Sequence, residues 1–229
     1  SLTKTGLGIL ELAGQNTYSG DTTVSAGTLV VNGSLANGAL SVASNATLMG
    51  SGTIGGLATI FGTHSPGNSP GIETFASNLS YAGGSSQLVW ELWSNTVSNS
   101  PLAYDQIIVN ADLAFTGGTS LSLDFGGSGV GTVDWDDAFW GTPQTWALFD
   151  VAGSTTGFGN LSLTQSPSAW LDASGQAFSA SSRSANSFSV AQQGSDVVVQ
   201  YVVVPEPGAL ALAGLGLAAV AGALRRRRS

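Results

Sequence analysis

The 229-residue sequence contains no cysteine, a single histidine (His64) and only six basic residues. Without cysteine, neither a disulfide nor a thiolate metal site can form, and one histidine cannot build a histidine metal cluster. We therefore expect no metal site and no cofactor.

Basic residues are almost confined to the last few positions. Four of the six stand there, which leaves Lys4 and Arg183 against 13 of the 14 acidic residues, since Glu206 also lies near the end. Two positive charges against 13 negative ones give the part before Val204 a formal charge of −11. Such a surface repels phosphate backbones, so the composition argues against nucleic-acid binding.

Charged residues make up only 9% of the chain, whereas glycine occupies 32 positions, a composition typical of repetitive β-structure. From Gly6 to about Phe61, apolar and small residues alternate, and Gly, Asn or Ser interrupts them about every eight to twelve residues. This rhythm predicts an all-β fold with a β-solenoid, parallel β-helix-like, over residues 1–64. A further all-β region is expected over 65–203, followed by a tail at 204–229.

The first 33 residues contain motifs at a characteristic spacing. These are Asn16-Thr17-Tyr18 with Gly20, then Thr22-Thr23-Val24, then Gly27-Thr28-Leu29. The segment resembles the autotransporter-associated β-strand repeat, which implies a β-solenoid of the kind found in exported passenger proteins. An autotransporter passenger followed by its own barrel is not expected, because no run of amphipathic barrel strands follows.

The segment 65–71, Ser-Pro-Gly-Asn-Ser-Pro-Gly, predicts a structural corner, and His64 beside it is expected to be a loop residue. Further strands are predicted near 86–93, 104–110, 119–125 and 169–172. The threonines at 22, 23 and 28 do not continue into a regular ladder along the sequence, which argues against a flat ice-binding face.

One acidic cluster stands out as a candidate ligand loop. It consists of Asp134, Trp135, Asp136 and Asp137, followed by Trp140. Three carboxylates within four residues suit Ca²⁺ or a sugar, with the two indole rings offering stacking faces. The competing interpretation is a solvated acidic loop held in place by its aromatic residues.

No catalytic set is recognisable in the sequence. There is no phosphate-binding loop, and a catalytic triad would have to use His64. We therefore expect a protein that is not an enzyme. The alternative is a carbohydrate-active or carbohydrate-binding β-helix protein that uses the 134–137 loop.

The tail has three parts in a fixed order. It opens with Val204, Pro205, Glu206 and Pro207, and continues with an apolar run at 208–224 that contains only Gly, Ala, Leu and Val. It closes with a membrane-stop cluster of Arg225, Arg226, Arg227 and Arg228. At 1.5 Å per residue the apolar run spans roughly 25 Å as a helix, close to the hydrocarbon core of a bilayer, which predicts a single C-terminal transmembrane helix.

This order resembles the PEP-CTERM sorting tail of exported bacterial proteins. The resemblance implies a sorting protease of the exosortase type that acts near Val204–Pro207, an inner-membrane intermediate, and a final location at the cell surface or extracellular matrix of a Gram-negative-type bacterium. Arginines at the cytoplasmic side would leave the body outside. We also expect an upstream signal peptide, and a structural or adhesive role in which extracellular polysaccharide is a candidate partner.

Overall fold

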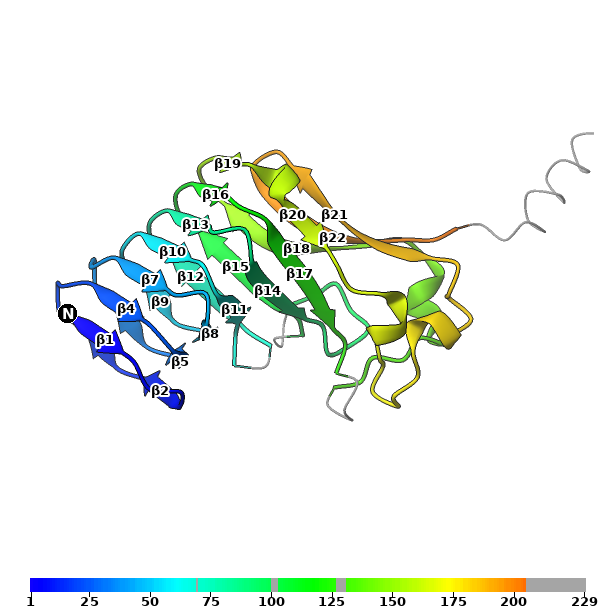
Figure 1. The fold of residues 1–229 in the computed structure, drawn as a ribbon. Helices are drawn as coiled ribbons and strands as arrows, with labels where there is room; N and C mark the ends of the chain where they lie inside the picture. The colour runs from blue at the N-terminus through cyan, green and yellow to red at the C-terminus, as the bar shows by residue number, and fades with distance from the viewer. Residues whose placement is uncertain (69, 100–102, 127–130, 205–229) are drawn as a thin grey trace, which may run out of the picture.

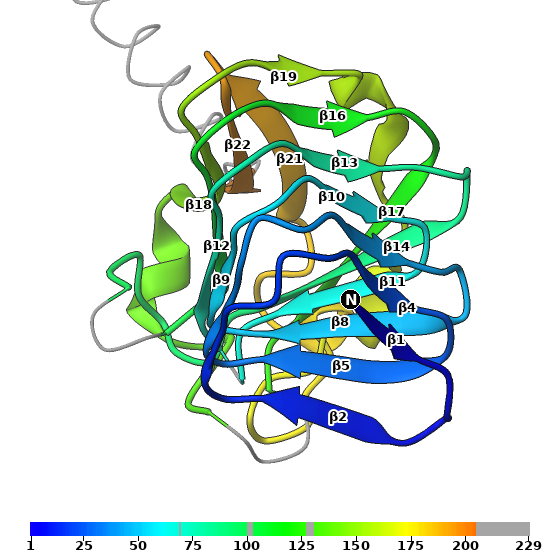
Figure 2. The same cartoon turned by 90° about the vertical axis from the view of Figure 1, so that its left-hand side faces the viewer.

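The structure is a computed structural model that describes residues 1–68, 70–99, 103–126 and 131–204. Three sheets wind around one interior, and each turn of the chain adds one strand to each sheet (Figures 1 and 2). Successive turns pair in parallel throughout, except at the last strands of the third sheet. The prediction of an all-β fold built from parallel sheets is confirmed.

The first sheet contains β1 (Leu2–Lys4), β4 (Thr22–Val24), β7 (Leu40–Val42), β10 (Ala58–Ile60), β13 (Leu79–Tyr81), β16 (Leu113–Phe115) and β19 (Thr155–Thr156). The second contains β2 (Ile9–Leu12), β5 (Gly27–Val31), β8 (Ala46–Gly50), β11 (Thr63–Pro66), β14 (Ser86–Glu91), β17 (Thr119–Asp124) and β20 (Leu161–Leu163).

The third sheet begins with short parallel strands and ends in an antiparallel hairpin. Its parallel strands are β3 (Gln15–Asn16), β6 (Ser34–Leu35), β9 (Thr53–Ile54), β12 (Ile72–Phe75), β15 (Gln106–Val109) and β18 (Gln144–Val151). The hairpin of β21 (Ser187–Gln193) and β22 (Asp196–Val202) then pairs with β18 through β22. Within the described residues, the third sheet thus ends in an antiparallel pair of strands.

Helical structure in the described residues is limited to four single turns of 3-10 helix. They are η1 (Ala138–Gly141), η2 (Phe158–Asn160), η3 (Pro167–Ala169) and η4 (Phe178–Ala180). None of the described helices is long and apolar enough to cross a membrane. The predicted transmembrane run at 208–224 lies outside the described residues. The strand expected at 169–172 was wrong, since η3 and one isolated bridge, Leu171 to Ala177, occupy that stretch.

Inward-facing side chains repeat from turn to turn because the strands stack in register. In the second sheet, the central column is made of Leu10, Leu29, Leu48, His64, Leu88, Leu121 and Leu163. Stacked apolar residues of this kind give each turn a buried face that it could not form alone. Strand β11 and all three sheets run across the expected boundary between 1–64 and 65–203, so these residues share one interior.

His64 is not the loop residue that the sequence predicted. It lies in β11, fully buried, at a position where the neighbouring turns carry leucine. The prediction failed because the corner begins later, at Gly67, whose φ of 88° is the left-handed conformation that glycine tolerates.

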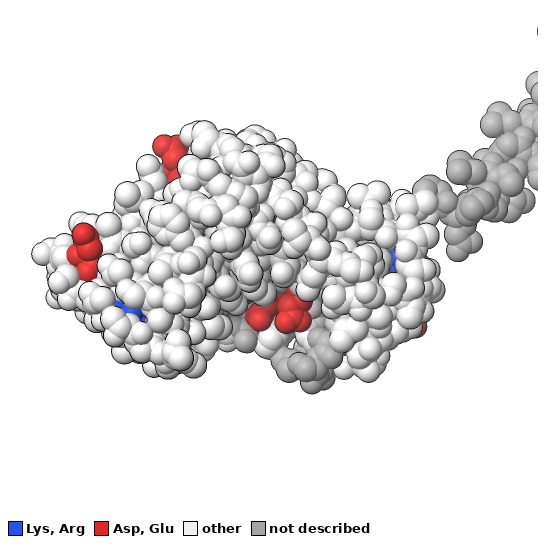
Figure 3. All heavy atoms as spheres, in the orientation of Figure 1, with Lys and Arg blue, Asp and Glu red and all other residues white. Residues whose placement is uncertain are grey.

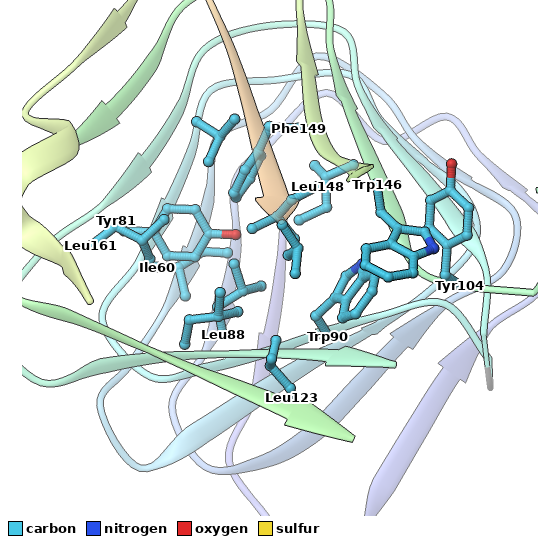
Figure 4. Packing of buried hydrophobic residues seen from close by; sticks show 14 of the residues in the cluster. Ile60, Tyr81, Leu88, Trp90, Tyr104, Leu123, Trp146, Leu148, Phe149 and Leu161 are labelled. Carbon is cyan, nitrogen blue, oxygen red and sulfur yellow. The ribbon is translucent and has the colours of Figure 1, made fainter. Parts of the chain in front are cut away.

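Two partners from the other walls satisfy the buried imidazole. Its Nδ1 is 2.5 Å from the Tyr81 hydroxyl, and its Nε2 is hydrogen-bonded to the Glu73 carboxyl. His64, Glu73 and Tyr81 thus come from the second, third and first sheets and meet in the middle, where Figure 4 shows Tyr81 among Ile60, Leu88 and Phe149. Burial raises the pKa of Glu73, and the nearby His64 partly offsets this.

Hydroxyl side chains also stack, on the outside of the first sheet. Thr23, Ser41, Thr59 and Ser80 are paired in register on successive strands. This ladder is not visible in the sequence because the turns differ in length. Hydrogen bonds between equivalent positions of neighbouring turns join residues 18 apart in an early turn, and residues 34 and 42 apart in later turns. Ala114 interrupts the ladder at the next strand.

Substitution of His64 tests whether the buried side chains of Glu73 and Tyr81 depend on it as a hydrogen-bond partner. His64→Leu leaves the Glu73 carboxyl and the Tyr81 hydroxyl buried without their partner, which should lower the free energy of unfolding by about 3 kcal/mol. The triple variant His64→Leu, Glu73→Leu, Tyr81→Phe removes all three polar groups and should recover most of that loss. Urea denaturation measures both, and a triple variant that is less stable than the single one would contradict this account.

Candidate functional site

Long insertions leave the solenoid at one corner, between the second and third sheets. In the early turns this connection is short, as between β5 and β6, which only Asn32 and Gly33 separate. In the last three turns it grows to residues 92–105, 125–143 and 164–186, which we call the cap. Because equivalent corners of successive turns lie next to each other, the three insertions meet beside the solenoid (Figure 1).

Tryptophans fasten the cap insertions to one another and to the sheets. The indole N–H of Trp135 donates to the Gln176 carbonyl oxygen at 3.1 Å. Those of Trp140 and Trp146 donate to the Asn95 side-chain oxygen (3.1 Å) and to the Thr96 carbonyl oxygen (2.7 Å). Each ring therefore bridges two segments that are far apart in sequence, while its body fills the space between them.

These rings form a second, aromatic core. Trp135 and Trp140 have centroids 4.9 Å apart, Trp140 lies 5.0 Å from Tyr201, and Trp135 lies 5.0 Å from Phe178. Trp146 joins this cluster to the solenoid interior, since its ring lies 6.0 Å from that of Trp140 and 5.7 Å from that of Trp90. Figure 4 shows Trp90 and Trp146 next to each other. The cap and the solenoid thus share a continuous apolar interior.

The candidate ligand loop lies in the cap, and its aromatic residues do not face solvent. Trp135 and Trp140 are both 0% exposed, so neither ring offers a stacking face to a sugar. Of the two interpretations of this loop, the buried rings favour the solvated acidic loop held in place by its aromatic residues. Sequence spacing does not distinguish a ring that pins a loop from a ring that binds a ligand.

The three carboxylates of the loop are exposed and serve local structure. Asp134 accepts the backbone N–H of Asp136 at 2.9 Å, and Asp137 caps η1 by accepting the N–H of Phe139 at 2.7 Å. Asp136 accepts the hydroxyl of Ser182 at 3.0 Å, which links two insertions. Within the described parts of the chain, no group of three His, Cys, Asp or Glu side chains is placed to hold a metal ion.

A cleft of about 350 Å³ lies between the second sheet and the cap. Val89, Ser122, Leu123 and Asp124 line it from the sheet, and Gln165, Ala169 and Leu171 line it from the last insertion. The Gln165 side-chain oxygen accepts the Leu123 N–H at 2.8 Å and the Trp170 indole N–H at 3.0 Å, and so fixes the two walls. Sequence reasoning missed this cleft, because nothing in the spacing of Asp124 and Gln165 shows that they meet.

Acidic side chains also cluster beside Asp124 of this cleft. Glu91 lies opposite Asp124 on neighbouring strands, and burial first, then Asp124, raises the pKa of Glu91 to about 7. Asp105 is fully buried and accepts the N–H groups of Gly71 (2.8 Å) and Glu91 (3.0 Å). Burial, with smaller contributions from Glu91 and Glu73, raises the pKa of Asp105 to about 9.

Basic side chains do not neutralise this region. Of the two in the described residues, the Lys4 ammonium binds the carbonyl oxygens of Gly6 and Ala26, and Arg183 contacts the Asp137 carbonyl oxygen. Figure 3 shows acidic groups gathered in the middle of one face, within a surface that is otherwise almost uncharged.

Two family models match this chain, one at each end. A model described as a passenger-associated-transport-repeat matches residues 2–31, which cover β1 to β5. A model described as a PEP-CTERM protein-sorting motif matches residues 203–228. The chain carries a PEP-CTERM sorting motif. Both resemblances read from the sequence are thereby confirmed.

Two larger proteins share a stretch of sequence with this chain. Two proteins named as extracellular serine proteases, both from Serratia marcescens, are 46% identical over 71 residues and 51% identical over 59 residues. These stretches are 31% and 26% of this chain but only 7% and 5% of the proteases. The likeness is therefore limited to a small part of each protease.

Together the PEP-CTERM motif and the repeat indicate an exported protein of a Gram-negative bacterium. The motif implies processing by an exosortase, a sorting enzyme.

The PEP-CTERM match begins on the folded body itself. Val203 and Val204 directly follow β22, and the Val204 N–H donates to the Asn186 side-chain oxygen at 2.8 Å. The Asn186 side-chain amide donates to the Tyr201 hydroxyl at 2.5 Å, which in turn donates to the Trp140 carbonyl oxygen at 3.0 Å. The cap is thus connected by hydrogen bonds to the start of the PEP-CTERM motif.

The buried acid Asp105 predicts a stability that falls as pH rises. The folded protein keeps the Asp105 proton up to about pH 9, whereas the unfolded chain loses it near 3.8, so folding takes up a proton between these values. The stability that protonated Asp105 contributes is fully present below the unfolded pKa of 3.8 and is lost as pH rises through the folded pKa of about 9. Asp105→Asn, which keeps an acceptor for the Gly71 N–H, should flatten this dependence in urea denaturation.

The matched control is Asp112→Asn. Asp112 is exposed, and hydrogen bonds from Ser154 lower the pKa of Asp112, so its contribution is lost only as pH falls. An Asp105→Asn protein whose stability between pH 5 and pH 9 changes with the same slope as that of the wild-type protein would contradict the assignment.

Proposed function

We propose that this chain is a non-enzymatic surface or extracellular-matrix protein whose β-solenoid has a structural or adhesive role. The observation that carries the proposal is the PEP-CTERM match immediately after the last strand of a folded, exported-type repeat body. The carboxylates of the 134–137 loop are bound within the cap, which supports a structural role for them.

The tail acts as a removable sorting signal in this proposal. The run at 208–224 holds the protein in the inner membrane, and the arginines from Arg225 to Arg228 keep the end of the chain in the cytoplasm. An exosortase-type protease then recognises Pro205, Glu206 and Pro207 and releases the body to the cell surface or matrix. An uncharged run of 17 residues is near the lower limit for a membrane span, which suits a temporary anchor.

Adhesion to extracellular polysaccharide is a second part of the proposal, and the cleft beside the second sheet is its best location. Ser122, Asp124 and Gln165 supply hydroxyl, carboxylate and amide groups there, next to apolar walls from Val89 and Leu171. Hydroxyl-rich ligands use groups of these kinds, because the carboxylate accepts hydrogen bonds while the amide nitrogen and the hydroxyl can donate them. Binding at the cleft would not require exposed aromatic rings from the 134–140 segment.

Mass spectrometry of the exported protein tests the sorting step. The mature protein should lack the four terminal arginines, whereas a variant with Pro205→Ala, Glu206→Ala and Pro207→Ala should keep them and stay with the membrane. Pro167→Ala, which changes an exposed proline of the cap, is the matched control and should be processed normally. An intact C-terminus on wild-type protein at the cell surface would contradict removal of the tail.

A further inference from the structure

One side chain, that of Asn186, binds the backbone at the junction between body and tail. After β22 ends at Val202, the Val204 N–H is held by the Asn186 side-chain oxygen at 2.8 Å. Val202 and Val204 are 44% and 49% exposed, whereas Val203 between them packs against the hydrophobic core. Beyond Val203, this backbone hydrogen bond holds Val204 on the body.

Asn186 is itself held in one orientation. Its backbone N–H donates to the Arg183 carbonyl oxygen at 2.8 Å, and its side-chain amide donates to the Tyr201 hydroxyl. Tyr201 is fully buried, 5.0 Å from Trp140 and 5.2 Å from Phe188 between ring centroids. Since the amide nitrogen is committed to Tyr201, the amide oxygen faces the Val204 N–H.

The sorting motif has few backbone donors to offer. Proline has no N–H, so among the four residues from Val204 to Pro207 only Val204 and Glu206 carry one. Enzymes that bind an extended peptide commonly pair with its backbone as an added strand. The folded body therefore occupies one of the two amides that a processing enzyme could use.

We propose that Asn186 is a positioning residue that withholds the Val204 amide from the sorting protease, so that the motif is fully readable only when this hydrogen bond opens. The inference rests on the proposed sorting function. The cap contributes through Tyr201, whose hydroxyl is bound by the carbonyl oxygen of Trp140 at the end of the candidate loop. That loop then affects sorting by holding Tyr201, without touching the protease.

Substitution of Asn186 should separate this role from a structural one. Loss of one hydrogen bond of ordinary strength should raise the population in which the Val204 N–H is unbonded about fivefold. In Asn186→Ala we therefore expect Val204 amide exchange, measured by NMR on the full chain in detergent micelles, to be about fivefold faster. Removal of the tail, measured by pulse–chase in cells that contain an exosortase, should be faster by a similar factor.

Two variants serve as controls. Asn186→Asp keeps an oxygen that accepts the Val204 N–H, and its second oxygen can accept the Tyr201 hydroxyl in place of the amide bond, so both rates should remain close to those of the wild-type protein. Asn160→Ala removes a comparable bond from a side-chain amide to a backbone oxygen, that of Phe115 at 2.8 Å, away from the junction. It should change neither the exchange of Val204 nor the rate of processing.

Each other outcome overturns the proposal in a recognisable way. Faster exchange of Val204 in Asn186→Ala with an unchanged or slower processing rate would refute the withholding of this amide, as would unchanged exchange. A wild-type chain that is processed no better than the variant lacking Pro205, Glu206 and Pro207 would overturn the sorting function, and this role of Asn186 with it.

Discussion

The register between successive turns is the constraint on which the rest of this structure depends. Each strand contributes only a few residues, so no turn can bury its own apolar face, and stability comes from stacking on the turns before and after. A residue therefore has to match its equivalents in neighbouring turns. Where Leu48 and Leu88 flank His64 in one column, the histidine is accommodated only because Glu73 and Tyr81 reach it from the other two walls.

Register constrains the strands but not every corner, and the cap follows from this difference. Insertions between the second and third sheets leave the strand pairing unchanged, since β14 still matches β17 residue by residue after the insertion at 92–105. Insertions at one corner of adjacent turns are neighbours in space, so they can bury aromatic residues against each other. A long insertion in a single turn would have had no such partner.

The sequence predicts the features of this fold that are set within one strand, and does not predict those that are set by the alignment between turns. Alternation from Gly6 to Phe61 was sufficient to predict parallel solenoid strands, because side chains with a period of two report directly on which face is inside. The environment of His64 and the ladder from Thr23 to Ser80 were not predictable. Both depend on which residues are equivalent in turns of unequal length, and local sequence does not contain that alignment.

The candidate loop illustrates the same limit for function. Asp134 to Trp140 resembles a ligand site because carboxylates and indoles are adjacent in the sequence, yet the rings are buried and the carboxylates close turns. The significance of this loop lies in what it supports: Trp140 holds Tyr201, Tyr201 holds Asn186, and Asn186 holds Val204. Because this chain of contacts forms only when the cap is folded, an unfolded cap would leave the start of the sorting motif free. Folding of the exported body and exposure of its sorting signal are therefore coupled through one hydrogen bond.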